Sequence, residues 1–183
     1  MESLIIIILL IILLTIWVVS IRRKLLVLDE NVDNAMSQIG VQISSRFDAM
    51  TALLNQAKVY ASCESLTQME VIKAKRNVIT ANSLPNEVLG QEGVIAEGLD
   101  CIDVVAKQHP ELKLEEWYTK YMDAVECYEK MVRTSLLIYN DSVAKLNRTI
   151  RTIPTRLVAG MLGFHQRDYL DVSEKAKYTK YII

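Results

Sequence analysis

The polar residues whose types and spacing could support chemistry lie beside the apolar faces of two long helical segments. Gln38, Gln42 and Arg46 recur every four residues, and Asn140 and Asn147 are seven apart, so each set shares one face of a helix. Buried amide and guanidinium groups require hydrogen-bonding partners, so this spacing favours interhelical hydrogen bonds that fix the register of packed helices. A ligand site is the alternative interpretation.

Known catalytic motifs are missing from the sequence. It contains no Gly-rich phosphate loop, no H-E-x-x-H and no G-x-S-x-G. His109 precedes Pro110 in a predicted turn, where a solvated side chain is expected. The remaining hypothesis for an enzyme uses Arg46, Asp48 and Glu64, which lack a recognisable nucleophile. We therefore expect a protein that is not an enzyme and has no small-molecule substrate.

Metal ligands are also not expected. Cys63, Cys101 and Cys127 lie far apart, form no C-x-x-C motif and have no His nearby. The helical carboxylates lack the Glu-x-x-His pairs of di-iron bundles, and we predict that they form solvated faces; examples are Glu115, Glu116, Glu126 and Glu129. The net charge of -1 gives no basic excess for nucleic acid. The sequence thus indicates no cofactor, no metal and no nucleic-acid partner.

The N-terminal stretch Leu4–Ile21 predicts a membrane anchor. It carries no charge, Gly or Pro, and as a helix it would be about 27 Å long, close to the thickness of the bilayer hydrocarbon. Trp17 is placed for the membrane interface, and Arg22, Arg23 and Lys24 end the stretch. A cleaved signal peptide is disfavoured, because no basic segment precedes the stretch and no small-x-small site follows it.

The charges around this anchor predict its orientation. Only Glu2 lies on its N-terminal side, against three cations on the other, so the positive-inside rule places the N-terminus outside and the following domain in the cytoplasm. The lipid bilayer is therefore the first expected partner. Residues 1–24 form the predicted anchor and its basic end.

Apolar periodicity predicts an all-α fold for the rest of the chain. Apolar residues from Leu25 to Ala61, and again over 114–153, recur at a mean of 3.6 residues, the period of a straight helix. The first Gly is Gly40, so the anchor and the first long helix should be continuous. Shorter helices are predicted over 62–81 and 85–107, with a possible break at Gly90–Gly93. The expected architecture is an antiparallel bundle of about four helices over 25–163, followed by a tail over 164–183.

Several short motifs resemble those of the LemA family of bacterial membrane proteins. The matching segments, in chain order, are Val32-Asp33-Asn34-Ala35, Ser37-Gln38-Ile39, Val41-Gln42-Ile43, Arg46-Phe47-Asp48, Tyr60-Ala61, Pro110-Glu111-Leu112-Lys113, Tyr139-Asn140 and Gly163-Phe164. Their polar members, which the resemblance marks as structural or interaction residues, are Gln38, Gln42, Arg46, Asp48, Lys58, Tyr60, Glu64, Tyr139, Asn140 and Asn147. The chain departs from the usual motifs at Met36, Cys63, Leu136 and the segment Ser45–Leu53.

The resemblance implies a single-pass protein of the bacterial inner membrane with a helical bundle and no established enzymatic activity. We expect a scaffold that self-associates into a homo-oligomer at the membrane. A regulatory adaptor, which would bind a partner through the tail or the basic cluster Lys73–Arg76, is the alternative. The family context also suggests other membrane proteins, such as a membrane-associated peptidase, as partners.

Overall fold

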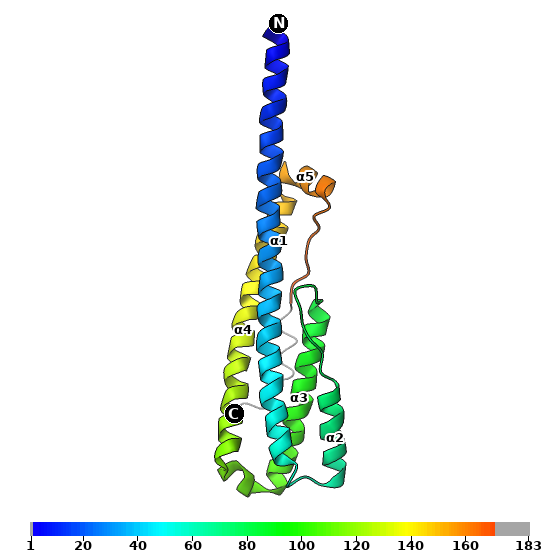
Figure 1. The fold of residues 1–183 in the computed structure, drawn as a ribbon, viewed down its shortest axis with the longest axis vertical. Helices are drawn as coiled ribbons and strands as arrows, with labels where there is room; N and C mark the ends of the chain where they lie inside the picture. The colour runs from blue at the N-terminus through cyan, green and yellow to red at the C-terminus, as the bar shows by residue number, and fades with distance from the viewer. Residues whose placement is uncertain (1, 171–183) are drawn as a thin grey trace.

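The computed structural model describes residues 2–170, and one long helix, α1 (Glu2–Ala57), organises them (Figure 1). Its first part projects alone from the bundle, and its most apolar stretch is not buried. This stretch is long and apolar enough to cross a membrane. No helix breaker separates it from the part of α1 that packs in the bundle, so the predicted continuity of anchor and rod is confirmed.

The bundle packs against the second part of α1. The other long helix, α4 (Glu116–Arg151), runs antiparallel to α1 along most of the bundle (Figure 1). The helix α3 (Pro85–Gln108) also packs on α1, and α2 (Cys63–Ala74) packs on α3. The short η1 (Pro110–Leu114) joins α3 to α4, and α5 (Thr155–Leu162) contacts both α1 and α4. The predicted all-α antiparallel bundle is therefore observed.

Two predicted helix ends are wrong. The first rod ends at Ala57 instead of Ala61, because the chain turns over Lys58–Tyr60 and the Ser62 side chain then caps α2. The predicted helix over 62–81 ends at Ala74. Beyond it an irregular segment contacts two helices: the Asn77 backbone N–H donates to Gln91 Oε1 of α3 (2.6 Å), and the buried Ile79 lies against Gly40 of α1.

Two glycines allow close packing within the bundle. A Cβ atom on Gly40 would collide with the backbone of Ile79, so this position needs glycine for the irregular segment to lie on α1. A Cβ atom on Gly98 would collide with the Met50 side chain between α3 and α1. By contrast, α3 runs unbroken through Gly90 and Gly93, which resolves the possible break there.

After α5 the chain returns along the bundle in an extended form. Gly163 adopts a left-handed conformation (φ 77°) and ends α5. Phe164 packs against the core, and Leu170 is almost fully buried. The packed part of the chain thus continues to Leu170, beyond the predicted bundle boundary. The rest of the predicted tail, residues 171–183, lies outside the described residues.

Candidate functional site

A charged cluster joins three helices in the core of the bundle. Arg46 of α1 donates through Nη1 to Glu92 Oε2 of α3 (2.7 Å) and through Nη2 to Glu129 Oε2 of α4 (3.0 Å). All three residues are buried. Arg133, one turn further along α4, donates to the other oxygen of Glu129 (2.7 Å). We call Arg46, Glu92 and Glu129 the buried triad.

The buried triad and Arg133 together carry two positive and two negative charges, so the cluster is neutral overall. Neutrality matters because desolvating an ionised side chain costs several kcal/mol unless it is paired and hydrogen-bonded. Each carboxylate comes from a different helix, so the planar guanidinium fixes the positions of α3 and α4 relative to α1. The expected interhelical contact of Arg46 is therefore present.

The three residues of the enzyme hypothesis lie in different surroundings. Arg46 is buried, Asp48 is exposed and pairs with Arg76 (2.8 Å), and Glu64 is exposed in the first turn of α2. The space between the Glu92 and Glu129 carboxylates holds the Arg46 guanidinium. Among residues 2–170, no group of three or more His, Cys, Asp or Glu residues could hold a metal ion.

A second polar network binds the extended segment 164–170 to α4. The Asn147 side chain accepts from the Arg167 backbone N–H (2.9 Å) and donates to the Arg167 carbonyl (2.9 Å). Asn140 makes the same pair of hydrogen bonds with the backbone of Leu170 (2.9 and 2.8 Å). Each side-chain amide thus pairs with a peptide group as a neighbouring β-strand would. We call Asn140 and Asn147 the amide clamp.

The spacing of the amide clamp matches an extended chain. Two residues seven apart on a helix are separated by about 10.5 Å along its axis, and three residues of extended chain cover about 10 Å. Residues 167 and 170 can therefore pair with Asn147 and Asn140 at the same time. Between them, the Tyr139 hydroxyl donates to the Asp168 carbonyl (3.0 Å). Burial raises the pKa of Tyr139, which keeps this hydroxyl protonated as a donor.

Arg167 also ties the segment to α1. Its guanidinium donates to Asp29 (3.1 Å) and to Asp33 (3.2 Å), which lie one turn apart. Burial raises the pKa of Asp33, Arg167 lowers it, and the neighbouring Asp29 raises it. We expected the two Asn residues to link helices. The amide clamp instead holds an extended segment that belongs to no helix.

The other predicted polar residues are spread over the bundle. Gln38 is exposed and Gln42 is half-buried, and neither side chain makes a hydrogen bond within residues 2–170. Lys58 pairs with Glu70 (2.6 Å), and the Tyr60 ring lies against His109 with ring centres 5.7 Å apart. In the predicted anchor, Leu4 and Trp17 are exposed, whereas Ile21 packs against the edge of the core. Arg22, Arg23 and Lys24 are exposed.

The basic cluster Lys73–Arg76 is engaged within the chain. Lys73 donates to Glu70 (2.7 Å), Lys75 pairs with Glu97 (2.8 Å), and Arg76 pairs with Asp48 and lies over the Phe47 ring. A partner binding there would have to displace these contacts.

Sequence reasoning missed Glu92, Arg167 and the acidic pair Asp29 and Asp33, and it predicted a solvated Glu129. One signal was available: Glu129 and Arg133 are four residues apart on one helical face, the spacing of an ion pair. The same spacing occurs in exposed ion pairs of this chain, such as Glu126–Lys130 and Asp141–Lys145, so the signal does not predict burial.

The sequence matches a known family. A comparison with curated proteins finds none that matches this chain. The LemA family model matches residues 35–182, which is most of the chain and begins after the apolar part of α1. The match confirms the resemblance seen in the sequence motifs, and the observed helical bundle agrees with the expectation drawn from it. The chain therefore belongs to the LemA family.

Proposed function

We propose that this protein is a non-enzymatic scaffold, anchored in the bacterial inner membrane, that self-associates through its helical bundle. The observation that carries this proposal is the continuity of α1 from the apolar stretch into the core. A domain on a flexible linker could take any orientation, whereas a helix without a breaker fixes the bundle relative to the bilayer. Membership of the LemA family is consistent with a membrane-associated protein that lacks catalytic activity.

The charge asymmetry around the apolar stretch favours an external N-terminus and a cytoplasmic bundle. Two native cysteines offer a test, because Cys63 and Cys127 are exposed on the bundle while Cys101 is buried. We expect a membrane-impermeant maleimide to label the protein only after the inner membrane is permeabilised. Equal labelling in spheroplasts with an intact inner membrane would contradict a cytoplasmic bundle.

Self-association is supported by apolar side chains on the outer surface of α4. Met131 and Ile138 are two turns apart on one face, and Leu137 lies beside Ile138; all three are exposed. Copies held in one membrane are concentrated in two dimensions, which strengthens weak contacts between such surfaces.

The test is the mass of the full chain after extraction in mild detergent. We expect a homo-oligomer, and we expect Met131→Glu combined with Ile138→Glu to shift it toward monomer. The matched control is Val71→Glu with Val104→Glu, which introduces the same charges at exposed apolar positions of α2 and α3. A strictly monomeric wild-type protein, or equal dissociation by both double variants, would contradict self-association through α4.

A further inference from the structure

The short helix α5 presents an apolar face that the rest of the described chain does not cover. Leu157 and Met161 are one turn apart on α5 and are 70% and 87% exposed, and Ile153, in the turn that precedes the helix, is 81% exposed. The opposite side of α5 is fixed to the bundle, because Val158 and Ala159 are buried. The helix is thus held in place by one side while its outer side offers three large apolar groups.

The position of α5 is close to the end of the apolar stretch of α1. The helix packs against α1 and α4 directly below the part of α1 that projects alone (Figure 1). The core begins at this level, because Ile21 packs against it and Leu25, which follows the basic end of the stretch, is fully buried. In Figure 1, α5 lies beside the blue part of α1, which the colour bar places near residue 20. The outer side of α5 therefore lies at the level of Arg22–Lys24, where the chain would leave a bilayer.

Exposed cations lie at the same end of the bundle as this apolar face. Arg148, Arg151 and Arg156 are exposed, and none forms an ion pair within residues 2–170; the same holds for Arg22, Arg23 and Lys24. Elsewhere on the bundle, exposed cations such as Lys75 and Arg76 are paired with carboxylates. Lys113 and Lys120, at the opposite end, are also exposed and form no ion pair within residues 2–170, so six of the eight cations without an ion pair in this range lie at the end of the bundle nearest the apolar stretch.

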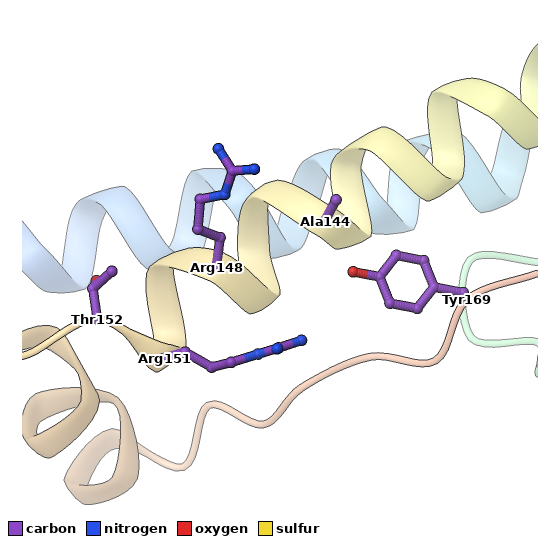
Figure 2. A pocket seen from close by; sticks show the side chains of 5 residues that line it. All are labelled: Ala144, Arg148, Arg151, Thr152 and Tyr169. Atoms are coloured by element: carbon purple, nitrogen blue, oxygen red, sulfur yellow. The ribbon is translucent and has the colours of Figure 1, made fainter.

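A shallow pocket of about 340 Å³ opens between α4 and the segment 164–170 at this end. It is lined by Ala144, Arg148, Arg151, Thr152 and Tyr169 (Figure 2). The Arg151 side chain extends along the segment toward Tyr169, whose hydroxyl points into the space beside α4, whereas Arg148 projects from the other side of α4. Guanidinium and hydroxyl groups are the donors that bind phosphate oxygens.

We propose that α5 rests on the surface of an anionic bilayer as a second membrane contact. Ile153, Leu157 and Met161 enter the region between headgroups and acyl chains, and Arg148, Arg151 and Arg156 bind lipid phosphates. The inference rests on the proposed membrane anchor, which holds α5 beside the lipid. A second copy is disfavoured as the occupant, because a symmetric contact through this face would bring arginines against arginines.

The test places an environment-sensitive fluorophore on the full chain in proteoliposomes. Met161→Cys carries the probe, with Cys63→Ser and Cys127→Ser removing the exposed native thiols. The matched control is Leu114→Cys, since Leu114 is 88% exposed and lies in η1 at the opposite end of the bundle. Leu10→Cys reports insertion of the apolar stretch. Vesicles contain phosphatidylcholine with phosphatidylglycerol, with or without brominated lipid.

We expect brominated lipid to quench the probe at 161 at least about twofold more than the probe at 114, and aqueous iodide to do the reverse. Quenching at 10 but not at 161 overturns the α5 contact while the anchor stands. Absence of quenching at 10 overturns the proposed anchor itself. The probe at 161 could also be shielded from both quenchers and lose that shielding when the protein is diluted in lipid. That result would show that a second copy covers α5, and it would overturn the inference.

A charge variant tests the role of the arginines. Arg148→Gln, Arg151→Gln and Arg156→Gln together should reduce lipid quenching at 161 to the level found in pure phosphatidylcholine vesicles. The three side chains are exposed, so the bundle should fold unchanged, which quenching at 114 by iodide would verify. Undiminished quenching in anionic vesicles would overturn the assignment of the arginines to lipid phosphates.

Discussion

Two charged triads in this molecule are built as opposites. The buried triad holds one cation, Arg46, between two carboxylates, whereas an exposed triad at the α1–α2 corner holds one carboxylate, Glu70, between Lys58 and Lys73. Their N–O distances are similar, at 2.7 and 3.0 Å in the core and 2.6 and 2.7 Å at the surface. Burial therefore distinguishes them: water screens the surface triad, whereas the side chains of the buried triad are only 6–10% exposed.

The largest loss of stability is expected when the cation of the buried triad is removed. Arg46→Leu removes the guanidinium from two buried carboxylates, and we expect the free energy of unfolding to fall by about 3–5 kcal/mol. Urea denaturation of the full chain in detergent micelles, followed by circular dichroism, measures this loss.

A triple variant separates charge from shape. Arg46→Leu with Glu92→Leu and Glu129→Leu removes the buried charges together and should recover most of the stability, because apolar replacement of a whole buried ion cluster is often neutral or stabilising. Arg133 is half exposed, so water can solvate it after the change. A triple variant as unstable as Arg46→Leu would attribute the loss to packing instead of unpaired charge.

The stabilisation expected from the amide clamp is intermediate between those of the two triads, because the clamp is partly buried but uncharged. Asn147→Ala removes two hydrogen bonds to Arg167, and we expect a loss of about 1–3 kcal/mol together with faster hydrogen exchange over 164–170. Asn140→Ala should cost less, since Asn140 is only half-buried. Asn34→Ala, at an exposed position on α1, is the control. Unchanged exchange in Asn147→Ala would show that the clamp does not hold the segment.

The smallest effect is expected at the surface triad, and it depends on pH. Hydrogen bonds from Lys58 and Lys73 lower the pKa of Glu70 from 4.5 to about 2. Because the folded-state pKa is depressed, the stabilisation is fully present above pH 4.5 and is lost as the pH falls toward 2.

Glu70→Gln should therefore flatten the acid dependence of the melting temperature in this window, and at neutral pH it should lose the same small increment that the wild-type protein loses on acidification. The control is Glu64→Gln, at an exposed position on the same helix. An NMR titration of the Glu70 carboxyl carbon in the wild-type protein with a midpoint near 4.5 would contradict the lowered pKa.

The sequence predicted the long helices well, because apolar periodicity reports burial directly. Val32, Ile39 and Ile43 were expected on the core face of the first rod, and all are buried. The end of α2 was missed for a physical reason. Ile72 and Ile79 are seven apart, which fits one helical face, yet Ile79 is buried from an irregular segment that lies on α1. Spacing alone cannot distinguish these two ways of burying the same side chain.

The polar networks were predictable only in part. Arg46, Asn140 and Asn147 could be selected because each lies beside an apolar face. Their partners could not, since Glu92 and Glu129 are 46 and 83 residues from Arg46, and their meeting depends on how three helices are arranged around one another. Helical carboxylates are usually solvated, so no local signal marks the two that enter the core.

Where the apolar stretch of α1 spans a bilayer as proposed, the unbroken helix couples the orientation of the bundle to that of the membrane. Spanning helices tilt when the hydrocarbon thickness changes, and a helix without a hinge passes that tilt to everything packed on it. The part of α1 beyond Lys24 is about 50 Å long, so a tilt of roughly 10° would sweep its far end sideways by about 9 Å. Changes in lipid thickness too small to alter the bundle itself would therefore move its membrane-distal surface by nearly the width of a helix.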